Sequence, residues 1–161
     1  MNFTHLHVHS DFSLLDAAVS VKRLAEKAGK LGMSHLALTD HGNMFGTIEF
    51  IRACKENSVK PIIGCEMYVS PGSRFEKKVS EKNNRYFHLV LLAANREGYV
   101  NLIKLSTYAY TEGFYYTPRI DNELLSQYHG GLIALSACVS GEIPLLIQAG
   151  KIEDAEQKAL Y

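Results

Sequence analysis

Histidine side chains alternate along the opening run of the chain, at His5, His7 and His9, with Leu6 and Val8 between them. In an extended strand alternate residues share a face, so the imidazoles would lie on one face and the apolar side chains on the other. Neutral imidazole nitrogens that converge on one point make a good metal site. The pattern therefore predicts a metal-binding strand, against the alternative of a polar surface strand whose histidines occur there by chance.

A second pair of metal-competent residues, Asp40 and His41, directly follows the short apolar run 35–39. In parallel α/β folds functional groups gather at the C-terminal ends of strands. Two consecutive strands that end in His or Asp would therefore bring these groups together at one edge of the sheet. The loop after the first predicted strand adds another carboxylate, Asp16. Asp40 has an alternative role, which is to cap the turn that follows it.

Three further candidates lie downstream. Glu66 interrupts the apolar strand predicted at 60–70, and a carboxylate there is costly unless it is paired or bound to a cation, so it is a candidate bridging ligand. Its alternative is a position at a strand edge that faces water. His88 lies near the start of the strand predicted at 86–93, so its position alone gives it little weight. Cys138 could supply a thiolate to zinc beside imidazole and carboxylate ligands, or it could be a buried free cysteine.

The elements that must position these residues alternate between strand and helix patterns. We expect strands at 3–9, 35–39, 60–70, 86–93 and 132–135, and helices at 20–32, 47–57, 95–110, 121–127, 142–148 and 152–161. Such alternation predicts an α/β fold with a parallel sheet and right-handed crossovers. Periodicity alone does not decide whether the sheet closes into a barrel.

Composition limits the class of protein. A chain of 161 residues with 47% hydrophobic residues can form one domain with a substantial core. Lys plus Arg and Asp plus Glu are equal at 17 each, which excludes binding of nucleic acid by a strong overall positive field. Three cysteines without a CxxC spacing favour a reducing compartment. The start of the chain has no leader pattern and no apolar run is long enough for a membrane, so we expect a cytoplasmic protein.

Two basic features have open alternatives. The polar segment 71–85 carries five basic and two acidic residues and could follow phosphates, although such a segment is usually a solvated loop. Arg119 lies in a stretch rich in aromatic and turn residues. Its guanidinium could bind a phosphate or form an ion pair with an acidic residue at the surface, and we predict the ion pair.

Several stretches resemble a known family. The run from His5 to Ala17 and the segment 38–43 are similar to the first two motifs of the polymerase and histidinol phosphatase (PHP) family. More specifically, five segments resemble the N-terminal PHP domain of bacterial DNA polymerase III alpha subunits. They are Lys60–Glu66, His88–Ala93, Gly113–Tyr116, Pro118–Asp121 and Leu135–Cys138. Histidinol phosphatases share the His and Asp motifs but lack the Gly-Phe-Tyr-Tyr and Pro-Arg-Ile-Asp stretch.

The resemblance implies a distorted seven-stranded (β/α) barrel with up to three ions of zinc or manganese in a cleft at one end. The residues that match the ligand positions of the family are His7, His9, Asp16, His41, Glu66 as the bridge, His88 and Cys138. Asp40 would be a ligand or would orient one, and His5 falls outside the pattern. About five strands are present and no Asp-x-His motif follows Cys138. Residues 1–161 are thus expected to be the N-terminal portion of a PHP domain whose barrel and metal site are incomplete.

The resemblance also implies a function. The full-length parent would be a DNA-directed DNA polymerase that uses Mg²⁺, whereas this portion lacks the polymerase palm and should not polymerise DNA. Clustered divalent ions suit phosphoester hydrolysis, 3′–5′ exonuclease action or pyrophosphate cleavage. The alternatives are a metal-stiffened platform that docks the proofreading exonuclease subunit, and an independent phosphatase. Implied partners are DNA through the parent, the exonuclease subunit and other replisome subunits, with no membrane.

Overall fold

The computed structural model describes residues 3–77 and 86–160. Six helices and five strands follow one another in these ranges: α1 (Val21–Lys30), β1 (His35–Leu38), α2 (Thr47–Glu56), β2 (Lys60–Val69), β3 (Phe87–Ala93), α3 (Arg96–Thr111), β4 (Arg119–Ile120), α4 (Asn122–Tyr128), β5 (Leu132–Leu135), α5 (Glu142–Gln148) and α6 (Ile152–Leu160). The predicted α/β class is confirmed, and every predicted helix is present with small shifts at its ends.

Side-chain caps fix the starts of three helices. The side chains of Ser20, Asn95 and Asp121 each accept a hydrogen bond from the backbone amide three residues further on, at the starts of α1, α3 and α4. Such a bond satisfies one of the amide groups that the first helical turn leaves without a partner.

The sheet is mixed, so the prediction of a parallel sheet is wrong. β1 and β2 are parallel, but β2 pairs antiparallel with β3, and β3 pairs antiparallel with β5. The short strand β4 runs parallel to the end of β2. No helix lies between β2 and β3 in the described residues, and without a helical crossover the neighbouring strand can return in the opposite direction.

The opening segment is not a strand, which corrects the first prediction. Described residues 3–10 form no strand, and the backbone bends at Leu6 and His7. Two backbone hydrogen bonds hold the segment beside β1: Ala37 N donates to His5 O at 3.0 Å, and Thr39 N donates to Val8 O at 2.8 Å. The Thr39 hydroxyl adds two more, since it accepts from Val8 N and donates to Val8 O. The bend removes the strict alternation that a strand would impose on the histidines.

Arg119 plays neither of the roles expected for it. The side chain is buried, and its guanidinium donates to the backbone carbonyls of Gly113, Arg74 and Glu76. Those bonds close the loop that follows α3 onto the segment after β2. In the polar segment 71–85, Arg74 is buried as well, and residues 78–85 lie outside the described ranges.

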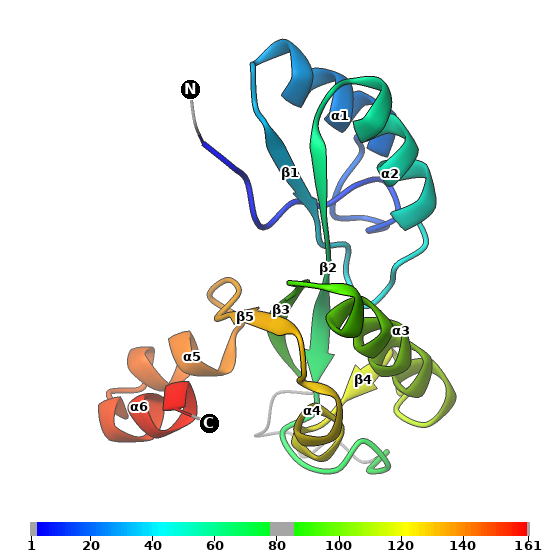
Figure 1. Cartoon of the computed structure of the whole chain (residues 1–161). Helices are drawn as coiled ribbons and strands as arrows, with labels where there is room; N and C mark the ends of the chain where they lie inside the picture. Colours follow the sequence, from blue (N-terminus) through cyan, green and yellow to red (C-terminus); the bar gives the residue numbers. More distant parts are fainter. Residues whose placement is uncertain (1–2, 78–85, 161) are drawn as a thin grey trace.

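Two principal cores lie at opposite ends of the long strand β2. One packs α1 and α2 against β1 around Phe50 and Leu38, and the other packs α3 and α4 against β2 and β3 around Met67 and Leu105. Figure 1 shows these two halves joined along β2, with α5 and α6 lying to one side beyond β5. The candidate site residues lie between the two halves, around the middle of β2.

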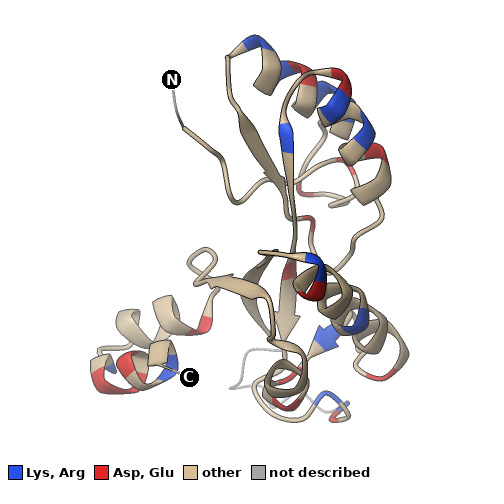
Figure 2. Ribbon diagram, in the orientation of Figure 1, with Lys and Arg blue, Asp and Glu red and all other residues tan. Residues whose placement is uncertain are grey.

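Charged residues of both signs are interleaved along α1 and α2, as Figure 2 shows. This agrees with the equal totals of basic and acidic residues in the sequence. Among the described residues, no helix combines the length and apolar character that a transmembrane span requires.

Gly98 allows α3 to approach the turn before β5. A Cβ at this position would overlap the carbonyl oxygen of Gly131. We therefore expect Gly98→Ala to lower the free energy of unfolding by about 1–3 kcal/mol, although alanine usually stabilises a helix relative to glycine. Urea denaturation measures the change. The exposed Gly72→Ala, where the nearest atom is a flexible carboxylate oxygen 3.2 Å away, is the control and should change stability by less than about 0.5 kcal/mol. A more stable Gly98→Ala protein would contradict the close approach.

Candidate metal centre

Four chain segments deliver side chains to one place. His7 and His9 come from the bent opening segment, His41 follows β1, Glu66 lies in the middle of β2, and His88 lies near the start of β3. Pairing within the sheet fixes the last three, because Glu66 faces Val90 of β3 and forms a bridge with His41 on its other edge. The 22 to 32 residues that separate successive segments in sequence therefore do not separate them in space.

The carboxylate of Glu66 is the centre of the cluster. Its Oε2 lies 2.6 Å from Nε2 of His7, 3.0 Å from Nε2 of His9 and 3.6 Å from Nδ1 of His41. Its Oε1 lies 2.9 Å from Nδ1 of His88. The Glu66 side chain is only 1% exposed. Glu66 is therefore not a carboxylate at a strand edge that faces water, which was the alternative interpretation of its place in the sequence.

A second carboxylate extends the cluster towards solvent. Asp16 Oδ2 lies 3.1 Å from Nε2 of His41, and its side chain is 54% exposed. Among the described residues, three overlapping groups have ligand atoms that all lie within 4.8 Å of one another. They are His7, His9 and Glu66; His9, Asp16 and His41; and His41, Glu66 and His88.

Electrostatics favour an ionised Glu66. Burial opposes ionisation, but the interactions with His88, His9 and His7 outweigh it and hold the pKa of Glu66 well below its usual range. The pKa of His88 is raised, chiefly by its interaction with Glu66. The pKa of His41 is lowered by burial, with the neighbouring His9 and His88 acting in the same direction. His41 is therefore held in the neutral form, which is the form that binds a metal.

Two buried polar atoms of the cluster have no hydrogen bond of good geometry: Nδ1 of His41 and Oε1 of Glu66. Oε1 lies 2.9 Å from Nδ1 of His88, but the two groups are not oriented as a hydrogen bond requires, so their interaction is electrostatic. A buried polar atom without a partner is costly. A divalent ion would satisfy both atoms, and an imidazole and carboxylate set suits zinc or manganese. The residues present therefore fit a metal ion.

The structure places the remaining predicted residues differently. Cys138 is exposed, not buried, and its Sγ lies 3.6 Å from Nδ1 of His88. Burial opposes ionisation of this thiol, but the backbone amide of Ser140 and the side chain of His88 together lower its pKa. Asp40 is buried and bonded to two serines, and it belongs to none of the three groups of described residues. His5 is exposed, with its ring against Phe3, away from the cluster.

Sequence reasoning missed an aromatic wall beside the histidines. The ring of Tyr68 stacks on His41 at 5.7 Å, and the ring of Tyr86 stacks on His88, also at 5.7 Å. The two tyrosines meet edge to face at 4.6 Å. Burial raises the pKa of Tyr68 to about 12, so its hydroxyl stays protonated. Tyr68 lies two residues after Glu66, and the two-residue period of a strand was the signal that could have identified it.

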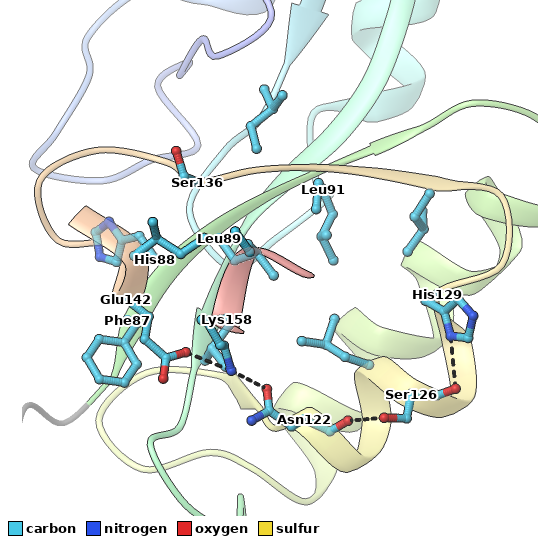
Figure 3. A pocket seen from close by; sticks show the side chains of 17 residues that line it. Phe87, His88, Leu89, Leu91, Asn122, Ser126, His129, Ser136, Glu142 and Lys158 are labelled. Atoms are coloured by element: carbon cyan, nitrogen blue, oxygen red, sulfur yellow. Dashed lines mark hydrogen bonds and ion pairs between the residues drawn. The ribbon is translucent and has the colours of Figure 1, made fainter. Parts of the chain in front are cut away.

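A cavity of about 460 Å³ lies next to the cluster and shares His88 with it. Figure 3 shows the cavity between β3, β5, α4 and the last two helices, lined mainly by apolar side chains. At its edge Lys158 Nζ lies 2.8 Å from the carboxylate of Glu142 and 3.2 Å from Oδ1 of Asn122. This space is apolar, so the chemistry of the site belongs to the histidine cluster and not to the cavity.

Comparisons with known proteins agree with the motifs. Over 159 residues, or 99% of this chain, the sequence is 52% identical to the DNA polymerase III subunit alpha of Treponema pallidum, and it covers 14% of that protein. It is also 52% identical over 161 residues to the subunit of Chlamydia trachomatis, of which it covers 13%. A solved structure from Bifidobacterium adolescentis, regarded as a metal-dependent phosphoesterase, covers 66% of this chain with 22% identity and a TM-score of 0.47. The match covers 32% of that structure.

The family model of the PHP domain matches residues 5–161. This range includes every histidine and carboxylate of the cluster. The chain therefore belongs to the PHP family, as the motifs of its sequence predicted.

Proposed function

We propose that residues 1–161 are the N-terminal portion of the PHP domain of a DNA polymerase III alpha subunit, and that their metal centre hydrolyses phosphoesters. The identity of about half the residues with two such subunits supports the first part. The observation that carries the second part is the buried Glu66 carboxylate, which is shared by four imidazoles and has a buried oxygen without a hydrogen bond.

The cluster can supply ligands to more than one ion. His7, His9 and Glu66 would hold the first, and His41, Glu66 and His88 would hold the second. Cys138 stands beside His88 and is available to the second ion. The group with Asp16 shares His9 with the first group and His41 with the second, so a third ion near Asp16 would need ligands beyond these residues. Zinc and manganese both accept such ligands.

Bound to these ligands, Zn²⁺ or Mn²⁺ would activate water and neutralise charge on a phosphoryl group. The chain itself performs the other tasks. Glu66 and the sheet beneath it fix the ligands rigidly, because the carboxylate is buried and lies in the ladder of β2. Tyr68 and Tyr86 close one side of the cluster with aromatic rings. Asp16, whose side chain is 54% exposed, lies where the cluster meets solvent.

The relatives support a proposal for the role of the full-length parent protein, although this chain spans only about one seventh of their length. In the parent, we propose DNA-directed DNA polymerisation with Mg²⁺ in domains outside this chain, and 3′–5′ removal of nucleotides as the use of the PHP centre. Its partners would be DNA, the proofreading exonuclease subunit and other replisome subunits, in the cytoplasm.

Hydrolysis is tested with the metal-free chain reloaded with Mn²⁺ or Zn²⁺ and given 3′-labelled single-stranded DNA or a nitrophenyl nucleotide ester. We expect turnover that requires the metal and is lost in His9→Ala purified in the same way, which controls for contaminating nucleases. Equal activity of the two proteins would contradict a phosphoesterase centre in this chain.

A second function, a docking platform, is favoured by the opening segment. This segment has no place in the sheet and few backbone bonds to it, so a metal held by His7 and His9 would fasten it to Glu66. Metal would then raise the stability of the chain without turnover of any phosphoester. Stability that responds to metal, together with no activity above that of His9→Ala, is the result that would favour the platform.

Metal should stabilise the fold under either function. A ligand that binds only the folded state at 100 times its dissociation constant adds about 2.7 kcal/mol to the free energy of unfolding. We therefore expect Mn²⁺ or Zn²⁺ to raise the melting temperature of the chain, and a chelator to reverse the rise. Differential scanning calorimetry measures it. A melting temperature that is the same with metal and with chelator would contradict the site.

A further inference from the structure

Asp40 is buried, and serines occupy both of its carboxylate oxygens. Its Oδ1 accepts hydrogen bonds from the backbone amide of Ser10 and from Oγ of Ser13, both at 2.6 Å. Its Oδ2 accepts a hydrogen bond from Oγ of Ser10 at 2.7 Å. All three residues are at most 2% exposed. The carboxylate of Asp40 thus anchors residues 10–13, which directly follow the histidines of the opening segment.

Ser13 connects this carboxylate to two of the candidate ligands. Its hydroxyl has one proton, which it donates to Asp40, so its oxygen can only accept further hydrogen bonds. It accepts one from the backbone amide of His41 at 3.1 Å, and it lies 3.5 Å from Nδ1 of His9. That oxygen can therefore accept a hydrogen bond from His9 only when the His9 proton lies on Nδ1, which is the tautomer of a histidine whose Nε2 holds a metal. That tautomer leaves the lone pair of Nε2 free, and Nε2 is the atom that faces Glu66.

The same serine also fixes the loop that carries Asp16. The backbone amide of Asp16 donates to the carbonyl oxygen of Ser13 at 3.1 Å. The position of Asp16 beside His41 therefore depends on where Ser13 is held. The buried carboxylate of Asp40 thus acts through Ser13 on three residues of the cluster: His9, Asp16 and His41.

We infer that Asp40 is not a metal ligand but a positioning residue, which acts through Ser10 and Ser13 to place Asp16 and to set His9 in the tautomer that binds metal through Nε2. This inference rests on the proposed metal centre. Groups that orient a metal ligand change metal affinity by about 10–100-fold when they are removed.

The test measures the affinity of the 161-residue chain for Co²⁺ by its visible absorption spectrum. We expect Asp40→Ala and Ser13→Ala each to weaken binding by about 10–100-fold with the band positions of the bound ion retained. Asp40→Asn should weaken it by less than about tenfold, because an amide oxygen can still accept from Ser10 and Ser13 while the amide group donates to Oγ of Ser10. An asparagine variant as weak as the alanine variant, with shifted bands, would show that Asp40 is a ligand.

Ser20→Ala is the matched control. Ser20 caps α1, so its loss costs stability but touches no candidate ligand. Its Co²⁺ affinity should equal that of the unchanged chain. An affinity as low as that of Ser13→Ala would mean that both variants act through stability, and the inference would fall.

Amide hydrogen exchange of the metal-free chain separates this inference from the proposed function. The backbone amides of His41 and Asp16 donate to Ser13, so we expect both to exchange slowly, and to exchange faster in Asp40→Ala, which removes the carboxylate that holds Ser13. If the unchanged chain binds no metal, the metal centre fails, yet this loss of protection would still support the part of the inference that concerns Asp40 and Ser13. Protection of both amides that is the same in the two proteins would overturn it.

Discussion

Replacement of Glu66 by glutamine should weaken metal binding more than about 100-fold, beyond the loss expected for a residue that merely orients a ligand. The reason is that two of the three candidate ligand groups among the described residues contain Glu66. Four imidazoles lie within 3.6 Å of its oxygens. Glutamine keeps the volume of the side chain but removes the negative charge, and a neutral amide is a poor bridge between two cations. Metal-dependent hydrolysis should disappear with the metal.

Isothermal titration with Mn²⁺ or Zn²⁺ measures the affinity, and Glu49→Gln makes the same change at an exposed position of α2. The control should bind metal as the unchanged chain does. In the metal-free Glu66→Gln protein the pKa of His88 should fall, because its interaction with Glu66 is the main cause that raises it. Two ions bound with unchanged affinity would show that Glu66 is not the bridge.

Local signals in the sequence predicted the helices well. The apolar spacing predicts a buried face of α1 made of Val21, Leu24, Ala25, Ala28 and Leu31. Val21, Ala25 and Ala28 are buried and Leu24 is half-buried, but Leu31, just after the helix, is exposed. Ser20 and Asp121 are residue types that favour helix starts, and both accept the hydrogen bond that a cap should accept. These features depend on residues a few positions apart, so the sequence alone carries enough information about them.

The direction of the strands could not be obtained from the same signals. A period of two shows that a segment is a strand but not which neighbour it pairs with or in which sense. The absence of a helical pattern between Val69 and Phe87 was the available evidence for an antiparallel return. The pairing of Gly64 with Leu92, and of Val69 with Phe87, shows that the chain does return in this way.

The opening histidines show how a wrong local prediction led to the right part of the chain. A regular strand would have put His5 beside His7 and His9, but the bend at Leu6 and His7 leaves His5 outside. The bend also brings His7 and His9 to the same oxygen of Glu66. A residue pattern identified the ligand types, whereas their convergence depends on tertiary contacts with β1 and β2 that no local pattern encodes.

Replacement of Arg74 by alanine should produce the largest loss of stability, about 3 kcal/mol. Breaking a buried ion pair costs about 3–5 kcal/mol, because the remaining charge has no partner. Arg74 Nη1 lies 3.1 Å from both oxygens of the buried Asp121, and Arg74 Nε lies 2.6 Å from Glu112. Burial opposes the charge of Arg74, but the surrounding carboxylates outweigh it and raise its pKa. We expect the lower end of the range, since Asp121 keeps hydrogen bonds from the amides of residue 74 and Leu124.

Denaturation by urea measures this loss, and Arg52→Ala is the control, an exposed arginine of α2 whose removal should cost less than about 0.5 kcal/mol. Arg74→Lys should recover only part of the loss, because one ammonium group cannot reproduce the planar fork that meets Asp121 and Glu112 at once. Where Arg74→Ala remains folded, its affinity for metal should be unchanged, since the arginine contacts none of the histidines. Equal stability of the Arg74 and Arg52 variants would show that Asp121 and Glu112 do not need this cation, and that the loop after β2 is held chiefly by Arg119 and its backbone partners.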